Sequence, residues 1–354
     1  MVDNSADMVV DVPRVKAVGS HQELGYKHGL EFKELIRESV RDLLNNMGSD
    51  SKSALISFSR NYLPFLERTT PHLLDEIRGI SEGADLTFDE ILALNLAPDF
   101  SQTKDGCTTF GLSRELMRDN DALVAQNADF LPKTDDYSVL LQLSLPSGLR
   151  IATLTEAGTI GTAGMNSEGL VRVGNGLYSG QKSSIGQPYY FLRRRMLEQE
   201  SVEGALSVAR EYPRSRPSGH LMADDSGRLL YAEMLSEDDR ILEPRNGWIG
   251  HTNHFVHDDF RTFETGTVQD SPARLLTISR LIAQNPRHNM EEIQGFLRNH
   301  ENYPYSICRH EGEVDGSKGM GWKTNASIIL RPGKAHVYLC HSSPCRNSFS
   351  SIQL

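Results

Sequence analysis

The residues with the clearest chemical potential lie in the stretch Lys104–Thr109, where Gly106 precedes Cys107 and two hydroxyl residues follow it. A thiol attacks a carbonyl carbon as the thiolate, and an ordinary cysteine pKa of about 8.5 leaves little thiolate at neutral pH. If the chain cleaves itself between Gly106 and Cys107, Cys107 gains an α-amine with a pKa of about 7.7–8.0 that can act as its base. Glycine before the cleaved bond removes a β-carbon and tolerates a strained backbone. The pattern predicts a self-processing nucleophile, although a single cysteine is more often a small buried apolar residue.

Three further polar residues could complete a site for acyl transfer. Asn253 follows a short apolar run, and its amide could donate to a developing oxyanion; otherwise it is simply the end of a strand. Asp129, at the end of Gln126–Asp129, could hold the new α-amine or a substrate group, or could be an ordinary turn residue. Arg309 could balance that carboxylate or bind an anionic substrate, or could be an exposed surface arginine.

Two other patterns are weaker. Three histidines occur at intervals of three, at His251, His254 and His257. Metal sites usually draw ligands from a second segment, so we expect solvated or supporting histidines here and no metal. Three glycines recur at the same interval, at Gly158, Gly161 and Gly164. Their spacing matches no nucleotide-binding motif, so tight turns and closely approaching strands are the better interpretation.

Composition limits the possible functions. The 354 residues are 24% charged and 38% hydrophobic, which is typical of a folded globular protein, and the net charge of −10 offers no basic surface for nucleic acid or an anionic membrane. No run approaches the roughly 18 apolar residues of a membrane span. Residues 1–13 lack the apolar core of a secretory signal, and the C-terminal Ser351–Leu354 lacks the basic residue of a peroxisomal address.

The cysteines indicate a compartment. They are few and scattered, at Cys107, Cys308, Cys340 and Cys345. This spacing does not suit a disulfide scaffold, so we expect four thiols in a reducing environment and a cytoplasmic location.

The elements that must position these residues change in character near Cys107. Before it, apolar spacing and capping residues predict helices at His21 to Asn46, Ala54 to Leu66, Pro71 to Ile80 with Thr70 as N-cap, and Thr87 to Leu94 with Glu90 completing a capping box. After it, alternation predicts antiparallel strands at Ala122 to Gln126, Ser138 to Leu145, Leu149 to Thr155, Thr159 to Gly164, Gly169 to Asn175, His220 to Ala223, Leu229 to Met234, Trp248 to His251, Ala326 to Arg331 and Ala335 to Cys340. Further helices are predicted at Tyr189 to Glu200, Ser201 to Glu211, Ser271 to Gln284 and Met290 to Arg298. Strands in sets and helices in pairs predict an α+β fold of two sheets covered by helices.

Several motifs together resemble the acyl-coenzyme A:6-aminopenicillanate acyltransferase (isopenicillin N acyltransferase) family, which comprises self-processing cysteine enzymes of the N-terminal nucleophile hydrolase type. The matching stretches are Glu23–Gly29, Asp105–Thr109, Gln126–Asp129, Gly164–Leu170, Thr252–Phe255, Ser306–His310 and Asn325–Cys340. Their order and spacing span most of the chain. Two features depart from the family: Ala128 stands where relatives commonly carry a bulky aromatic residue, and the peroxisomal ending is missing.

The resemblance implies an αββα sandwich made as one precursor and cleaved between Gly106 and Cys107. Residues 1–106 would form a helical N-terminal subunit and residues 107–354 the catalytic subunit of the same domain. By resemblance, Cys107 is the nucleophile and its α-amine the base. Asn253 would be an oxyanion donor, Asp129 would orient the new terminus, Thr109 would assist cleavage, and Arg309 would bind substrate.

The implied activity is transfer or hydrolysis of an acyl group on a small N-acyl amine or acyl thioester, as in secondary metabolism. Acyl-coenzyme A is a possible acyl donor, and no other cofactor is implied. Two alternatives stay open: a strict amidohydrolase of N-acyl or β-alanyl amines, and an unprocessed protein that only binds ligands.

Overall fold

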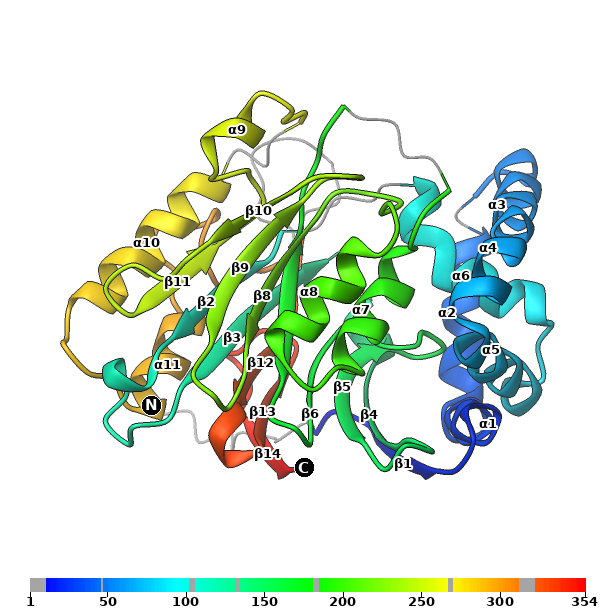
Figure 1. Cartoon of the computed structure of the whole chain (residues 1–354), viewed down its shortest axis with the longest axis horizontal. Helices are drawn as coiled ribbons and strands as arrows, with labels where there is room; N and C mark the ends of the chain where they lie inside the picture. The colour runs from blue at the N-terminus through cyan, green and yellow to red at the C-terminus, as the bar shows by residue number, and fades with distance from the viewer. Residues whose placement is uncertain are drawn as a thin grey trace, which may run out of the picture.

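The computed structural model describes residues 11–45, 47–101, 106–130, 134–180, 185–266, 270–311 and 322–354. Lys104 and Asp105 of the predicted cleavage motif, and most of the N-terminal stretch, lie outside these residues. Two sheets stack face to face, and helices cover both outer faces (Figure 1). Within the described ranges, no helix is both long and apolar enough to cross a membrane.

The N-terminal third is helical, as predicted, but its boundaries differ. The helices are α1 (His21–Glu31), α2 (Lys33–Asn45), α3 (Ser49–Asn61), α4 (Leu63–Thr69), α5 (Pro71–Ala84) and α6 (Phe88–Ser101). Two of the predicted helices are each divided, at Phe32 and at Tyr62. The capping box of Thr87 and Glu90 is confirmed by hydrogen bonds in both directions. Thr70 is the N-cap of α5 as predicted, but its side chain makes no capping hydrogen bond.

The larger sheet has eight strands in the order β1-β4-β5-β6-β7-β8-β9-β10. Their bounds are β1 (Arg14–Val18), β4 (Ser138–Ser144), β5 (Arg150–Glu156), β6 (Ala163–Asn166), β7 (Val171–Gly176), β8 (Ser218–Ala223), β9 (Leu229–Met234) and β10 (Asp239–Leu242). The pair β1 and β4 is parallel, and the other pairs are antiparallel.

The smaller sheet has six antiparallel strands in the order β11-β2-β3-β12-β13-β14. These are β2 (Thr108–Leu112), β3 (Leu123–Phe130), β11 (Trp248–His251), β12 (Lys323–Arg331), β13 (His336–His341) and β14 (Ser350–Gln353). The remaining helices are α7 (Tyr189–Leu197), α8 (Val202–Arg210), α9 (Asp258–Arg261), α10 (Ser271–Ala283) and α11 (Met290–Leu297). Short 3-10 turns occupy Arg114–Leu116, Thr134–Tyr137 and Pro332–Lys334.

Three apolar interfaces define the layers. Leu154 and Val173 of the larger sheet pack with Ile328 of the smaller sheet between the two sheets. The outer face of the larger sheet packs against the N-terminal helices and α7, and its other end packs against α8. Phe110 of β2 and Ile278 of α10 belong to the interface between the smaller sheet and its helices. The order is therefore helices, sheet, sheet, helices, which confirms the predicted αββα sandwich.

Some strand predictions were wrong. The strand predicted to end at Gln126 continues as β3 through Phe130, so Asp129 is a strand residue and not a turn residue. The strand predicted at Thr159 to Gly164 instead starts at Ala163, because Gly158 and Gly161 adopt φ angles of 90° and 132° in the preceding turns. Gly164 lies within β6, where an added β-carbon would stand 2.2 Å from the carbonyl oxygen of Ala152. The turn interpretation of these glycines is thus confirmed for two, and the close approach of strands for the third.

Candidate active site

Cys107 immediately precedes β2 and is only 1% exposed. It lines a cavity between the two sheets. The next residues alternate in direction along the strand: Thr108 contacts α10, and Thr109 contacts β7 of the opposite sheet. The start of β2 therefore places Cys107 beside the cavity between the two sheets.

Gly106 occupies a crowded position beside Cys107. Its backbone N–H donates to the carbonyl oxygen of Asp129 at 3.1 Å. A β-carbon here would stand 2.8 Å from the Trp322 ring and 3.0 Å from Nη1 of Arg309. A larger residue at position 106 would therefore have to displace the Trp322 ring or the Arg309 guanidinium.

The carbonyl oxygen of Cys107 is held by two side-chain donors. Nδ2 of Asn175 donates to it at 3.0 Å, and Nη1 of Arg274 donates at 2.6 Å. Oδ1 of Asn175 accepts from Thr109 at 2.8 Å and from the Tyr231 hydroxyl at 3.0 Å. These bonds fix the backbone on the C-terminal side of the predicted cleavage point.

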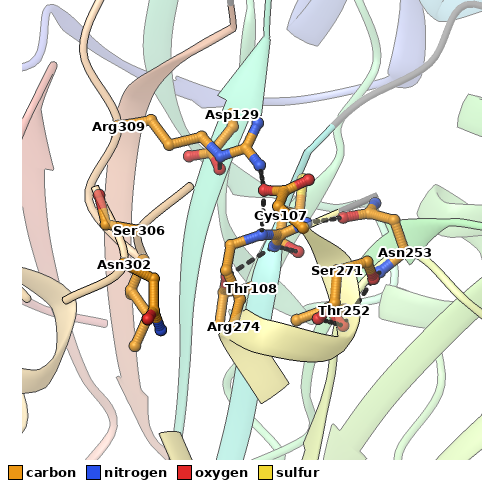
Figure 2. A network of polar contacts seen from close by, with 12 residues as sticks. Cys107, Thr108, Asp129, Thr252, Asn253, Ser271, Arg274, Asn302, Ser306 and Arg309 are labelled. Atoms are coloured by element: carbon orange, nitrogen blue, oxygen red, sulfur yellow. Dashed lines mark hydrogen bonds and ion pairs between the residues drawn. The ribbon is translucent and has the colours of Figure 1, made fainter. Parts of the chain in front are cut away.

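Arg274 connects most of the predicted site (Figure 2). Besides Cys107, its Nη1 donates to Oγ1 of Thr108 at 2.8 Å, and its Nη2 donates to Oδ1 of Asn253 at 2.9 Å. Its Nε pairs with Asp270 at 2.9 Å. One guanidinium in the first turns of α10 thus brings Cys107 and Asn253 together.

Asn253 is buried directly after β11, where the sequence placed it. Its backbone N–H donates to Oγ of Ser271 at 2.7 Å, and its Nδ2 donates to the carbonyl oxygen of Gly176 at 3.2 Å. Because Arg274 occupies Oδ1, the amide orientation is set with the NH₂ group as the donor. The Nδ2 donor therefore lies on the side of the Gly176 carbonyl oxygen.

Asp129 and Arg309 form the predicted ion pair, with Nε and Oδ2 3.5 Å apart. Oδ1 of Asp129 accepts from Thr324 at 2.7 Å, and Arg309 also pairs closely with Asp270. The expectation of an exposed arginine was wrong, because Arg309 is 5% exposed. Burial lowers the pKa of Arg309, while the nearby Asp129 and Cys107 act in the opposite direction.

The cavity beside Cys107 has apolar walls and a charged region. Its walls come from both sheets and include Ala128, Phe130, Leu154, Ala163, Ala326 and Ile328. Glu156, Arg172 and Arg193 also line it, and desolvation raises the pKa of Glu156 to about 7. Ala128, which departs from the family pattern, contributes directly to this wall.

The three histidines at intervals of three do not converge. Nε2 of His251 contacts Glu233 at 2.7 Å, while Nδ1 of His254 contacts Ser271 at 2.7 Å. His257 caps α9 through Asp259. Burial lowers the pKa of His254 to about 4, so this ring is neutral at physiological pH. His251 and His254 support the strand and loop that carry Asn253.

Sequence reasoning missed four polar residues of the site, namely Asn175, Asp270, Arg274 and Thr324. Asp270 and Arg274 have the i, i+4 spacing of an ordinary surface pair at the start of a helix. Asn175 lies between two glycines at the end of a predicted strand, and nothing in its neighbourhood marks it. Only the stacking of the sheets and α10 brings these residues to Cys107.

Two stacked sheets between helical layers, with a cysteine just before an inner strand, are the arrangement that the resemblance to the N-terminal nucleophile hydrolases predicted. Within that class, the chain belongs to the acyl-coenzyme A:6-aminopenicillanic acid acyl-transferase family, whose model matches residues 116–344, more than half of the chain. The 40 kDa form of acyl-coenzyme A:6-aminopenicillanic-acid-acyltransferase from Emericella nidulans is 28% identical over 315 residues, covering 86% of this chain and 87% of that protein.

Solved structures with a similar fold are more distant. Penicillin V acylase from Agrobacterium tumefaciens is 14% identical, with a TM-score of 0.47 over 66% of this chain and 83% of its own. A variant of conjugated bile acid hydrolase from Clostridium perfringens is 13% identical, with a TM-score of 0.44 over 70% of this chain and 97% of its own.

Proposed function

We propose that the protein is a self-processing enzyme that moves an acyl group from a small N-acyl amine or acyl thioester to an amine or to water through Cys107. One observation carries the proposal: Cys107 faces the cavity between the sheets while Asn175 and Arg274 hold its carbonyl oxygen. Any buried carbonyl oxygen needs one hydrogen-bond partner, but this one has two side-chain donors, and one of them is a buried guanidinium that also binds Asn253.

Self-cleavage comes first in the proposed sequence. The Cys107 sulfur attacks the Gly106 carbonyl carbon, the Gly106–Cys107 C–N bond breaks, and the nitrogen leaves as the new α-amine. The thiol proton passes to that nitrogen, and water then hydrolyses the Gly106–Cys107 thioester to a Gly106 carboxylate and the free thiol. The network favours this step because Arg309 and Trp322 crowd Gly106, and Thr109 and Arg274 fix the following backbone.

The proposed catalytic cycle has two further steps. The α-amine accepts the thiol proton, the thiolate attacks the substrate carbonyl, and the leaving amine takes the proton as the acyl-Cys107 thioester forms. An acceptor amine or water then attacks the thioester, and the thiol is restored. Nδ2 of Asn253 would stabilise the oxyanion as an amide donor, and its orientation is fixed by Arg274 at Oδ1 and by the carbonyl oxygen of Gly176. Asp129 would hold the new amine, with Arg309 balancing its charge.

The cavity supports a substrate with an apolar acyl portion and a polar end. Apolar residues of both sheets line one part, and Arg172 and Arg193 lie in the charged part. The small side chain of Ala128 leaves more room than an aromatic residue would. This favours an acyl group of different shape from that of the penicillin-forming relative.

Intact mass measurement of purified protein tests the self-cleavage step. The expected result is two fragments divided between Gly106 and Cys107, with Cys107→Ala remaining whole. Cys340→Ala, which removes a buried thiol away from the site, serves as the control and should be cleaved like the wild type. A wild-type chain that stays intact, or a Cys107→Ala chain that is cut at the same bond, contradicts the proposal.

The second test separates transferase from hydrolase. Processed protein is incubated with N-acyl amine and acyl thioester donors, with and without an added acceptor amine. A new amide product identifies an acyltransferase, and free acid alone identifies the strict amidohydrolase. Processed protein that consumes none of the donors and forms no acyl-Cys107 adduct by mass contradicts acyl transfer.

A further inference from the structure

A cluster of two thiols and two imidazoles lies beside the proposed site and has no part in the proposed chemistry. It consists of His300, Cys308, His310 and Cys345, whose ligand atoms all lie within 4.8 Å of one another. We propose that these four residues form a structural zinc site. The proposal goes beyond acyl transfer, and it does not depend on it.

The distances suit a tetrahedral ion. Zinc bonds of about 2.0–2.1 Å to nitrogen and about 2.3 Å to sulfur place neighbouring ligand atoms about 3.3–3.8 Å apart. Nε2 of His310 lies 2.9 Å from Nε2 of His300, 3.4 Å from Sγ of Cys345 and 4.0 Å from Sγ of Cys308. These three of the six spacings are within about half an ångström of that required, and the other three are at most 4.8 Å, so binding would draw the ligands together by about 1 Å at most.

The ligand chemistry selects zinc over harder cations. Two thiolates and two imidazoles form a Cys₂His₂ set, and magnesium or calcium would instead require oxygen ligands. Two thiolates also neutralise the charge of Zn²⁺, so the filled site adds no net charge near the Asp129–Arg309 pair. Four protein ligands leave no open position, which is the character of a structural site and not of a catalytic one.

The ligands come from three segments that other hydrogen bonds already hold together. The N–H of Cys308 donates to the carbonyl oxygen of Asn299, next to His300. Oγ of Ser343 donates to the carbonyl oxygen of Arg309, and Nε of Arg298 donates to the carbonyl oxygen of Pro344. The backbone is thus arranged for binding without the ion, which reduces the ordering that zinc would have to impose.

The proposed zinc site lies where it would fix the backbone of Arg309. Arg309 lies between the ligands Cys308 and His310, and its side chain reaches Asp129 and Asp270. A metal that fixes both neighbours also fixes the backbone that carries this guanidinium. Two features would then hold Arg309 in position: the zinc site, and the hydrogen bond that its backbone N–H donates to Oγ1 of Thr324.

A second group of possible ligands in the described residues is better explained without a metal. His21, His72 and Glu198 also lie close together. However, the buried guanidinium of Arg194 pairs with Glu198 at 2.9 Å, and His21 contacts Glu76 at 3.3 Å. An arginine already supplies the positive charge there, so a divalent cation would be repelled.

Metal analysis of the full-length protein tests the proposal directly. After dialysis against metal-free buffer, we expect about one zinc per chain by elemental analysis and native mass. Replacing zinc with Co²⁺ should give the visible bands of tetrahedral cobalt together with a thiolate-to-cobalt charge-transfer band. Loss of a residue that only supports a metal ligand lowers metal affinity about 10–100-fold. Cys345→Ala and His300→Ala each remove a proposed ligand itself, so their zinc affinity should fall by more than that. Cys340→Ala, the matched thiol outside the cluster, should bind metal like the wild type.

Stability provides a readout independent of both activity and self-cleavage. Zn²⁺ added to metal-free protein should raise the Tm of the wild type and of Cys107→Ala, but not that of Cys345→Ala, because a ligand stabilises the fold only where it binds. The proposal is overturned if wild-type protein takes up neither Zn²⁺ nor Co²⁺ in stoichiometric amount, or if Cys345→Ala binds them as tightly. A Cys308–Cys345 disulfide in freshly purified protein also overturns it. Failure here leaves the acyl-transfer proposal intact, since its tests measure fragments and products.

Discussion

Two buried arginines organise different halves of this molecule and do so in opposite ways. Arg194 of α7 binds both oxygens of Glu76 at 2.9 Å and Glu198 at 2.9 Å, so two carboxylates enclose its charge. Arg274 of α10 has one carboxylate, Asp270, which Arg309 also uses, and its other donors go to neutral oxygens. The first arrangement joins α5 of the N-terminal helices to α7, whereas the second holds the groups of the proposed site in place.

The difference teaches how to distinguish a structural buried cation from a functional one. Burial would raise the pKa of Glu76, but Arg194 lowers it below the ordinary value. That pair is mutually satisfied and has no donor to spare for a ligand. Arg274 instead directs its donors to the backbone of the proposed nucleophile, Cys107, and to the amide of Asn253. Burial is equal in the two cases, so the partners determine the role.

Arg274→Lys should have the largest effect on function. A lysine keeps the charge but cannot reach Cys107, Asn253 and Asp270 together, because it lacks the planar fork of donors. We expect self-cleavage and kcat to fall about 10²–10³-fold, the usual cost of losing a donor that fixes an oxyanion site. The fraction of chains cleaved over time and the kcat of processed protein are the measurements.

The control for this substitution lies on the same helix. Arg280→Lys changes an exposed arginine paired with Glu301 and should leave both rates unchanged. If Arg274→Lys reduces Tm but leaves cleavage and kcat within a few-fold of wild type, Arg274 is a structural cation like Arg194, and the comparison fails.

Arg194→Met should have the largest effect on stability. It leaves the buried Glu76 without its bidentate cation and with His21 at 3.3 Å as a weaker partner, which costs up to about 3–5 kcal/mol of unfolding free energy. The kcat of folded, processed protein should change little, because Arg194 contacts none of the site residues. Urea unfolding monitored by tryptophan fluorescence provides the measurement, and Arg194→Met combined with Glu76→Gln should recover part of the loss.

The same variant predicts a pH dependence. In the wild type the pKa of Glu76 is lowered, so its stabilising contribution is present above its ordinary pKa and is lost as the pH falls through the folded-state value. Without Arg194, burial raises the pKa of Glu76 against the weaker opposing effect of His21, and acid neutralises the carboxylate at a higher pH than in the wild type. The difference in stability between wild type and variant should therefore narrow as the pH is lowered. A difference that is constant from neutral to acid pH would mean that Glu76 does not cause it.

The sequence predicted the parts of the site that depend on local chemistry. Gly106, Cys107 and Thr109 form one motif, and the charges of Asp129 and Arg309 suggested their pairing before any coordinates. It did not predict Arg274, because the apolar face of a helix does not reveal which polar residue turns inward. The four proposed zinc ligands escaped for a related reason, since their spacing of 8, 2 and 35 residues becomes a cluster only when α11, the following loop and the end of β13 meet.

The fold shows the same division between local and long-range information. Alternating apolar residues identified strands buried on both faces, such as β5 and β9. Strands β1 and β14 were missed, because these edge strands of only five and four residues are too short for the alternation to stand out. Strand β2 was also missed, because its hydroxyl and glycine residues are buried by the opposite sheet and not by their own apolarity.

Arg228→Met should have the smallest effect on the unfolding free energy. It tests the same comparison with an arginine that lies outside the core. Arg228 resembles Arg194 in having two carboxylate partners, Glu203 at 3.1 Å and Glu243 at 2.6 Å, but its side chain is 34% exposed and theirs are 64% and 56% exposed. Water screens each charge, so removing the arginine leaves nothing unsolvated, and we expect a loss of about 0–1 kcal/mol that shrinks further with added salt. Urea unfolding of Arg228→Met and Arg194→Met at low and high salt measures both. If Arg228→Met lowers the unfolding free energy as much as Arg194→Met does, the stabilisation by Arg194 depends on its number of carboxylate partners and not on their burial. The distinction between buried and exposed arginines would then be wrong.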